Sequence, residues 1–206
     1  MAHNYIKFSF IALCFLIALY SYRFCVSKKD WTYLSVAMGF TLISDFFLVL
    51  AGNYRAGVFF FCFAHMAYIL RVNTNRSVIR IGAAVLAGVM IGGLLYFILP
   101  VHDFLVILAA VYASLFLQNL SAHVRYCRSG GPDVLPLANR WLMLSGLILF
   151  ALCDVHVMLF SLPDFLPVPE EIGHWGLMWI WIFYTPSQLL LSISAIRWYT
   201  SLPAIL

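Results

Sequence analysis

The sequence predicts an all-α protein, a polytopic transmembrane helical bundle in which residues 1–206 form one integral membrane domain. Two features of the composition support this class: 64% of the residues are hydrophobic, and only 10% are charged. Soluble domains carry about a quarter charged residues, so this chain could not cover a surface that faces water. A third feature is that apolar runs of about 20 residues, long enough to cross a bilayer, occupy nearly the whole length.

Seven such runs follow one another, and each is separated from the next by residues that interrupt helices or favour turns. The spans are predicted at roughly 5–25, 33–52, 56–71, 78–99, 103–126, 138–162 and 174–198. The interruptions are "SKKD", "GNYR", "NTNR", "PVHD", "RSGGPD" and "PDFLPVPEE". The first run lacks a small-residue cleavage site and leads into a basic loop, so we expect a mature helix rather than a signal peptide.

The basic residues predict how the helices are oriented. With seven spans, ten basic residues fall on one side: Arg23, Lys28, Lys29, Arg71, Arg76, Arg80, Arg125, Arg128, Arg140 and Arg197. Only Lys7 and Arg55 fall on the other side, which places the N-terminus outside and the C-terminus inside. We therefore expect a multi-pass membrane protein, located in the cell membrane if the source is bacterial. Topology accounts for the net charge of +4, so no nucleic-acid partner is expected.

Two acidic residues, Asp45 and Asp154, lie deep inside predicted spans, whereas the other six lie in loops or at helix ends. At 1.5 Å per residue, Asp45 is about 9 Å and Asp154 about 12 Å from the outer end of its helix. A buried charge in a span costs roughly 3 kcal/mol on insertion scales, so such residues usually have a function. Their similar depth predicts a shared site.

Other polar side chains occur near this depth. His65 and Tyr68 are three residues apart and share a helix face, as do Tyr184 and Gln188 at a spacing of four. Asn119 belongs to the same set but is nearer the inner end. Single polar residues of this kind often join helices by hydrogen bonds, which is the structural alternative for each of them.

These residues carry a resemblance to the YhhN family. The family signature pairs a Gly/Ser-Asp-x-x-Leu helix with a Gly-x-x-x-Phe-x-x-x-His-x-x-Tyr helix. The stretches "SDFFLVL" and "GVFFFCFAHMAYILR" match it through Ser44, Asp45, Leu48, Gly57, Phe61, His65 and Tyr68. The later "LFALCDVHVML" and "FYTPSQLLL" resemble the family's second Asp motif and its closing Tyr-x-x-x-Gln motif. Cys153 stands where a serine usually precedes the second aspartate, and an eighth helix, present in some members, remains possible.

The resemblance implies a lysoplasmalogenase, an ether hydrolase that acts on a lysophospholipid within the membrane. Such enzymes cleave the vinyl ether bond of 1-alkenyl lysophospholipids to a fatty aldehyde and a glycerophospho-amine, without a metal or an organic cofactor. Asp45 and Asp154 would then be the catalytic acid and base, by analogy with the two carboxyl groups of glycosidases. We expect Ser44, His65, Tyr68, Asn119, Tyr184 and Gln188 to bind substrate or to support the two acids.

Four other classes of membrane protein have to be compared with this prediction. All three lysines lie near the start of the chain, so the seventh predicted span has no lysine that could form a Schiff base. A rhodopsin-like pigment is therefore excluded. A zinc-dependent seven-helix lipid hydrolase usually has a His-x-x-x-His pair, and the six histidines contain none. Asp45, His65 and Asp154 offer a poorer set of three ligands, so this class stays a minor alternative. A proton-coupled transporter or a non-enzymatic lipid-binding protein uses buried acids equally well, so both remain alternatives.

Overall fold

The computed structural model describes residues 2–72, 77–100, 102–129 and 134–198, and these fold into seven α-helices. The helices are α1 (Ala2–Tyr20), α2 (Lys28–Asp45), α3 (Tyr54–Arg71), α4 (Ser77–Ile98), α5 (Phe104–Arg128), α6 (Leu137–Ser161) and α7 (Glu170–Ile193). Two short 3₁₀ segments, Ser21–Phe24 and Leu162–Asp164, and one π-helical turn, Phe46–Leu50, extend them. The predicted all-helical class is therefore confirmed.

One clear difference from the predicted spans is at the start of α2. The segment "SKKD" was predicted to separate two helices, but α2 already begins at Lys28. Ser27 is the N-cap, and its side chain accepts a hydrogen bond from the backbone N–H of Asp30. A serine cap followed by an acidic residue in the first turn stabilises a helix start, which explains why the polar segment is helical.

Six of the described helices are long and apolar enough to cross a membrane, and α3 is the exception. Helix α3 carries Arg55 and Arg71 near its ends and His65 in its middle, which lowers its mean hydropathy. Half of its 18 residues are buried against other helices. A helix face that packs on protein does not need to be apolar, so α3 can carry more polar residues than helices that face lipid.

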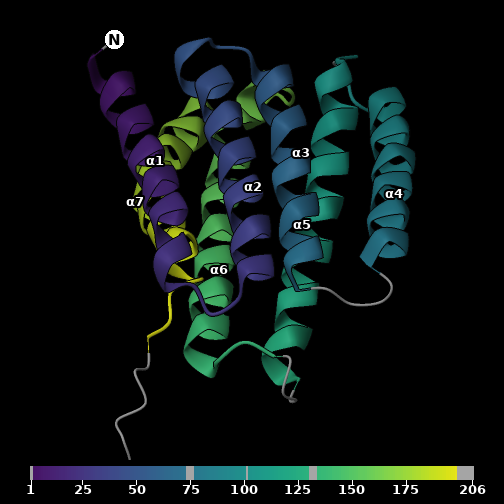
Figure 1. Cartoon of the computed structure of the whole chain (residues 1–206). Coiled ribbons are helices and arrows are strands. Elements are labelled where there is room, and N and C mark those ends of the chain that lie inside the picture. Colours follow the sequence, from purple (N-terminus) through teal and green to yellow (C-terminus); the bar gives the residue numbers. More distant parts are fainter. Residues whose placement is uncertain (1, 73–76, 101, 130–133, 199–206) are drawn as a thin grey trace, which may run out of the picture.

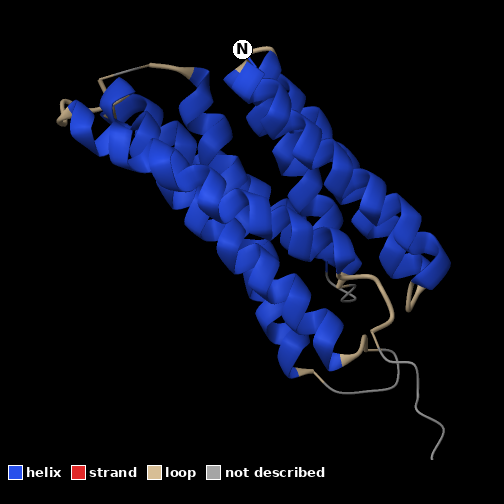
Figure 2. Ribbon diagram, turned by 90° about the vertical axis from the view of Figure 1, so that its left-hand side faces the viewer, coloured by secondary structure: helices blue, strands red, loops and turns tan. Residues whose placement is uncertain are grey.

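Six of the helices form a closed ring in the order α1, α2, α3, α5, α6 and α7, and α7 returns to contact α1. Helix α4 lies outside this ring and packs mainly on α5 (Figure 1). The described connections from α1 to α2 and from α2 to α3 are short, as the view turned by 90° shows (Figure 2). The main core, which includes Met38, Tyr68 and Phe150, lies within the ring. Any group in the middle of this ring is therefore enclosed by helices on all sides.

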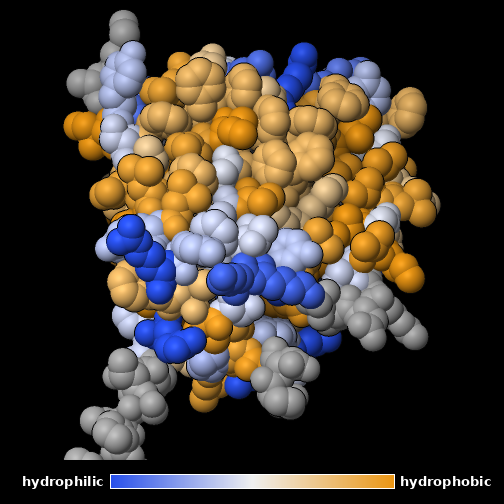
Figure 3. All heavy atoms as spheres, in the orientation of Figure 1, coloured by the Kyte–Doolittle hydropathy of each residue, from blue (hydrophilic) through white to orange (hydrophobic). Residues whose placement is uncertain are grey.

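Successive helices alternate in direction, so the ends of α1, α3, α5 and α7 lie at the same end of the bundle as the starts of α2, α4 and α6 (Figure 1). We call it the basic end, because Arg23, Lys28, Arg125 and Arg140 lie there. The face shown in Figure 3 has a wide apolar zone with hydrophilic residues on either side of it. This arrangement fits a bundle embedded in a bilayer.

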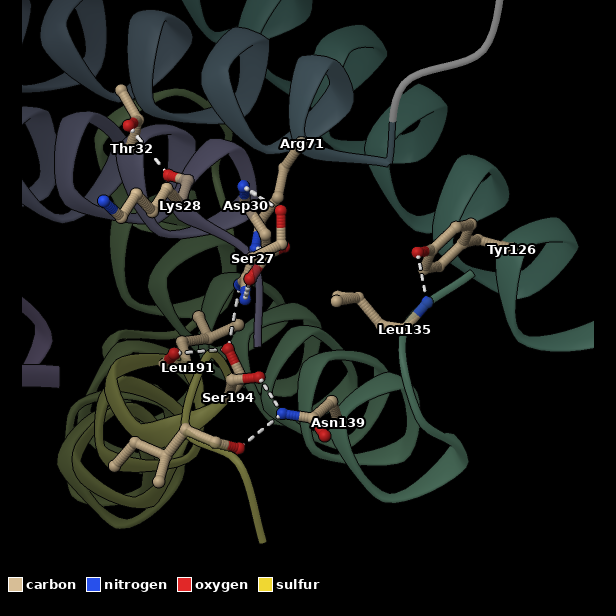
Figure 4. Close-up of polar contacts among 11 residues, drawn as sticks. Ser27, Lys28, Asp30, Thr32, Arg71, Tyr126, Leu135, Asn139, Leu191 and Ser194 are labelled. Atoms are coloured by element: carbon tan, nitrogen blue, oxygen red, sulfur yellow. Dashed lines mark hydrogen bonds and ion pairs between the residues drawn. The ribbon is translucent and has the colours of Figure 1, made fainter. Parts of the chain in front are cut away.

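A buried ion pair links helices at the basic end. The Nε and Nη2 atoms of Arg71 donate to the two carboxylate oxygens of Asp30 over 2.7 and 2.9 Å (Figure 4). The Nη1 atom of Arg71 donates to the hydroxyl of Ser194, and Asn139 donates to the backbone oxygens of Ser194 and Ile196. This cluster joins α2, α3 and α6 to the end of α7.

Helices α6 and α7 approach each other closely at Gly146. A Cβ atom on this residue would lie 2.8 Å from Cγ of Leu191, so only glycine fits without a shift. The hydroxyl of Ser187 donates to the backbone oxygen of Gly146 over 2.8 Å. The close approach fixes the register of α7 against α6, and with it the positions of Tyr184 and Gln188 on α7.

Candidate active site

The first aspartate of the predicted site, Asp45, ends α2 and is only 3% exposed. The hydroxyl of Tyr184 on α7 donates a hydrogen bond to its Oδ2 atom. Oδ1 has no hydrogen bond within the described residues. The π-helical turn Phe46–Leu50 begins directly after Asp45. Turns of this kind are frequent at functional sites, and no pattern in the sequence predicts this one.

The second aspartate, Asp154, is held in the same way. It is half-buried on α6, and the hydroxyl of Tyr112 on α5 donates to its Oδ2 atom over 2.7 Å. Sequence reasoning missed Tyr112, which stands alone in an apolar stretch of α5. Its depth along the helix would have indicated its role. Tyr112 is eight residues, or about 12 Å, from the start of its helix, and this equals the depth estimated for Asp154.

The two carboxyl–tyrosine pairs belong to one region of the bundle. Cys153 lies near both Asp45 and Asp154. Between the tyrosines lie aromatic rings: the Phe150 ring is 5.5 Å from Tyr184, and the His65 ring is 5.0 Å from Tyr112. His65 and Phe150 are also 5.5 Å apart. These rings form a continuous aromatic contact from one pair to the other.

Neither acid has a cationic partner. Among the described residues, the ion pairs are Asp30 with Arg71 and Asp103 with Arg55, and neither includes Asp45 or Asp154. Each acid of the candidate site is therefore held by a neutral phenol. Such a partner allows the carboxyl to change its protonation state, whereas a fixed positive charge would hold it ionised.

Three of the predicted supporting residues lie close to this region. Asn119 Nδ2 is 3.1 Å from His65 Nδ1, a hydrogen bond in which the amide donates to the ring nitrogen. Gln188 lies one turn beyond Tyr184 on α7 and is fully buried. Neither polar atom of the Gln188 amide has a partner within the described residues.

The other two, Ser44 and Tyr68, join helices instead of contacting the acids. The hydroxyl of Ser44 donates to the backbone oxygen of Gly57. The hydroxyl of Tyr68 donates to the sulfur of Met38 over 3.3 Å. Tyr68 shares a face with His65 as the spacing predicts, but it turns toward α2 and not toward either aspartate.

The matched glycine has a packing role. A Cβ atom on Gly57 would lie 2.4 Å from Cγ of Leu48, which belongs to the π-helical turn. Gly57 therefore lets the turn after Asp45 lie directly against α3. The residues Ser44, Leu48 and Gly57 hold the end of α2 against α3 and thereby position Asp45.

No three His, Cys, Asp or Glu side chains are grouped so that they could hold a metal ion, in the part of the chain that the structure describes. His156 is two residues after Asp154 in α6, but its side chain makes other contacts. Its ring stacks on Phe183 at 5.2 Å, and its Nδ1 atom donates to the backbone oxygen of Leu152.

The comparison with protein families gives a match to the model of the YhhN family over residues 3–195, which is nearly the whole chain. No curated protein and no solved structure matches the chain.

Proposed function

We propose that this chain, which belongs to the YhhN family, hydrolyses the vinyl ether bond of 1-alkenyl lysophospholipids within the membrane. Family membership suggests a hydrolase. The observation that carries the proposal is the pair of membrane-embedded carboxyls, each held by one tyrosine hydroxyl and, among the described residues, by no cation. Two acids that can hold different protonation states provide what this reaction needs, a proton donor and a base.

The reaction begins at the alkene. A carboxylic acid donates its proton to the alkene carbon farther from the ether oxygen, and the new C–H bond leaves an oxocarbenium ion. Water attacks the carbon next to oxygen while the second carboxylate accepts a proton from it, which gives a hemiacetal. The C–O bond to glycerol then breaks, the glycerol oxygen takes that proton, and the hemiacetal hydroxyl returns its proton to the first carboxylate. A fatty aldehyde and a glycerophospho-amine leave, and both acids regain their starting states.

The exposure of the two acids supports a division of roles. Asp154 is half-buried, so an alkenyl chain coming from the lipid can approach it, and we assign it as the proton donor. Asp45 is sealed among helices, and we assign it as the base that activates water. Tyr112 and Tyr184 stabilise the carboxylates through their hydrogen bonds, since bonds to a charged acceptor are stronger than neutral ones.

The direct test is an assay with purified protein in nanodiscs and three matched lysophospholipids that carry a 1-alkenyl, a 1-alkyl or a 1-acyl chain. We expect a fatty aldehyde only from the 1-alkenyl lipid, since the alkyl ether has no alkene to protonate. Mass spectrometry measures the aldehyde, and the Asp154→Asn protein is the control. Release of fatty acid from the acyl lipid alone would replace this proposal with a lysophospholipase, and no product from any lipid would favour transport or lipid binding.

A further inference from the structure

The middle of the bundle contains several fully buried polar atoms without a hydrogen-bond partner in the described part of the chain. They are Thr41 Oγ1, His65 Nε2, Asn119 Oδ1, His123 Nε2, and Nε2 and Oε1 of Gln188. All five residues are at most 1% exposed. A buried polar atom without a hydrogen-bond partner destabilises the folded state, so six such atoms together would destabilise this fold considerably.

One set of these atoms lies between α3 and α5. The amide of Asn119 donates to His65 Nδ1, so the proton of the neutral His65 ring is on Nε2. His123 Nδ1 is 3.0 Å from the backbone oxygen of Asn119 and donates to it, so its Nε2 is an acceptor. The unpartnered atoms here are thus one donor, His65 Nε2, and two acceptors, Asn119 Oδ1 and His123 Nε2. Such a mixed set suits molecules that both donate and accept.

The second set lies between α2 and α7. Thr41 is one turn from Asp45 toward the basic end, and Gln188 is one turn from Tyr184 in the same direction, because α2 and α7 run antiparallel. The hydrogen bond from Tyr184 to Asp45 brings the two helices into register at this level. The unpartnered hydroxyl and amide therefore stand directly on the basic-end side of the Asp45–Tyr184 pair.

Polar groups continue from these sets to the basic end. His123 interacts electrostatically with Arg71, and Arg71 donates to Asp30 and to Ser194. The polar groups thus extend from the level of the acids to the buried ion pair of Figure 4. On the opposite side of Asp45, α2 continues into the apolar turn Phe46–Leu50.

We propose that these side chains hold a file of buried water molecules that leads from the basic end to Asp45. A buried water typically makes about three hydrogen bonds to polar groups that would otherwise lack partners, and the sites described here provide donors and acceptors of both kinds. This inference rests on the proposed function: the water file supplies the molecule that attacks the oxocarbenium ion. The lipid then approaches from the side of Asp154 and the water from the side of Asp45, so the two reactants do not compete for one entrance.

Radiolytic footprinting in H₂¹⁸O tests the water itself and needs neither substrate nor activity. Hydroxyl radicals formed from bound water transfer ¹⁸O to the side chains that contact it. We expect ¹⁸O on His65 and His123, and none on Met38, which is equally buried but accepts its hydrogen bond from Tyr68. Unlabelled histidines would overturn the proposal, and so would labelling of Met38 at the same rate, because that would mean general penetration of solvent.

Substitution of His123 tests whether the file serves the reaction. His123→Phe fills the site with an apolar ring and should lower kcat about tenfold or more with KM nearly unchanged, because substrate binding is not altered. His123→Gln keeps groups that can bind water and should retain most of the activity. Leu117→Phe, which adds the same ring at a position of α5 that is 65% exposed, should behave as the unmodified protein.

The outcomes separate the two proposals. Full kcat in a folded His123→Phe protein would overturn the supply of water through this file, as would an equal loss in His123→Gln. If His123→Phe does not fold, the footprinting result decides. Labelled histidines in a protein that releases no aldehyde would leave the water file standing and reject the vinyl ether reaction.

Discussion

The acids inside the helical bundle have two different kinds of hydrogen-bond partner. At the basic end, Asp30 is only 6% exposed and makes a two-pronged ion pair with Arg71. In the middle of the bundle, Asp45 and Asp154 each accept a hydrogen bond from a tyrosine and have no cation beside them in the described residues. The first acid is neutralised by a permanent positive charge, and the other two are not.

This difference in partner distinguishes an acid that suits a structural role from acids that suit proton transfer. A guanidinium with two parallel hydrogen bonds fixes the ionised form of a carboxylate and the orientation of its helix. A phenol stabilises a carboxylate more weakly and lets it take up and release a proton. The Asp30–Arg71 pair therefore suits a structural role between α2 and α3, whereas the tyrosine-held pair suits proton transfer.

The largest expected effect is on catalysis. Asp45→Asn and Asp154→Asn should each lower kcat roughly 10² to 10⁴-fold, the usual contribution of a general acid or base. Each variant should remain folded, because asparagine can still accept a hydrogen bond from the tyrosine. Because both acids act on one bond, the double variant should lose much less than the product of the two single losses. Full aldehyde release by the folded double variant would contradict a catalytic role.

Deuterium distinguishes the two acids from each other. In D₂O, the Asp45→Asn protein should still protonate the alkene reversibly, so recovered substrate should carry deuterium at the alkene carbon farther from oxygen. The Asp154→Asn protein should leave the substrate unlabelled. Mass spectrometry of the unreacted lipid measures this, and the opposite pattern would exchange the roles assigned to Asp45 and Asp154.

The next largest effect is on stability at the basic end. Asp30→Ala leaves Arg71 buried without its partner and should lower the free energy of unfolding by about 3–5 kcal/mol. Asp30→Leu combined with Arg71→Met removes both charges and should recover much of this loss. Unfolding in detergent micelles measures the change, with Asp154→Asn as the matched control. Loss of activity in Asp30→Ala at unchanged stability would show that the pair belongs to the chemistry after all.

The tyrosines should matter less than the acids they hold. A hydrogen bond to a charged group contributes about 1.5–3 kcal/mol, so Tyr112→Phe and Tyr184→Phe should each lower kcat roughly 10- to 100-fold. The loss should be greater for Tyr184→Phe, because Asp45 is more deeply buried than Asp154. Steady-state rates of aldehyde release measure both variants. Equal losses would mean that burial does not distinguish the two pairs.

The smallest effect is expected at the ion pair of Arg55 and Asp103 at the opposite end of the bundle, where the side chain of Arg55 is 63% exposed. The backbone N–H of Leu105, and after it Arg55, lower the pKa of Asp103 below its usual value. The contribution of this residue to stability is therefore present above the unfolded-state pKa of about 3.9 and is lost as the pH falls through the lower folded pKa.

Arg55→Gln should therefore cost only about 0.2–1 kcal/mol at pH 7, the usual range for an exposed pair. Salt should reduce this cost further, because exposed charges are screened. Melting temperatures at low and high salt measure it. A loss as large as that of Asp30→Ala would remove the contrast between exposed and buried pairs.

The sequence alone predicts the fold class and part of the candidate site. Long apolar runs become helices because a backbone in a membrane must satisfy its own hydrogen bonds, so composition and interruptions alone gave all seven. Counting residues from the helix ends placed Asp45 and Asp154 at one depth, and the structure brings both near Cys153.

The remaining features depend on how helices face one another, which a single sequence does not encode locally. Tyr112 is one aromatic residue in an apolar helix, and only its neighbour Asp154 gives it a role. Asp30 and Arg71 lie at helix ends, where charged residues usually face water, yet the ring buries both. Tyr68 shares a face with His65, but a helix face is wide enough to contact two different neighbours.

The closing contact of the ring also bears on biosynthesis. The end of α7 pairs with the α1–α2 connection through backbone hydrogen bonds from Val26 to Ala195 and from Arg197 to Phe24. The ribosome synthesises Asp45 long before Tyr184. A nascent chain therefore carries this acid in the membrane without its hydrogen-bond donor until α7 is inserted. Chains truncated before α7 would expose an unsatisfied acid to lipid, and proteolytic quality control of membrane proteins could select against them on that basis. The arrival of α7 therefore supplies the hydrogen-bond donor of Asp45.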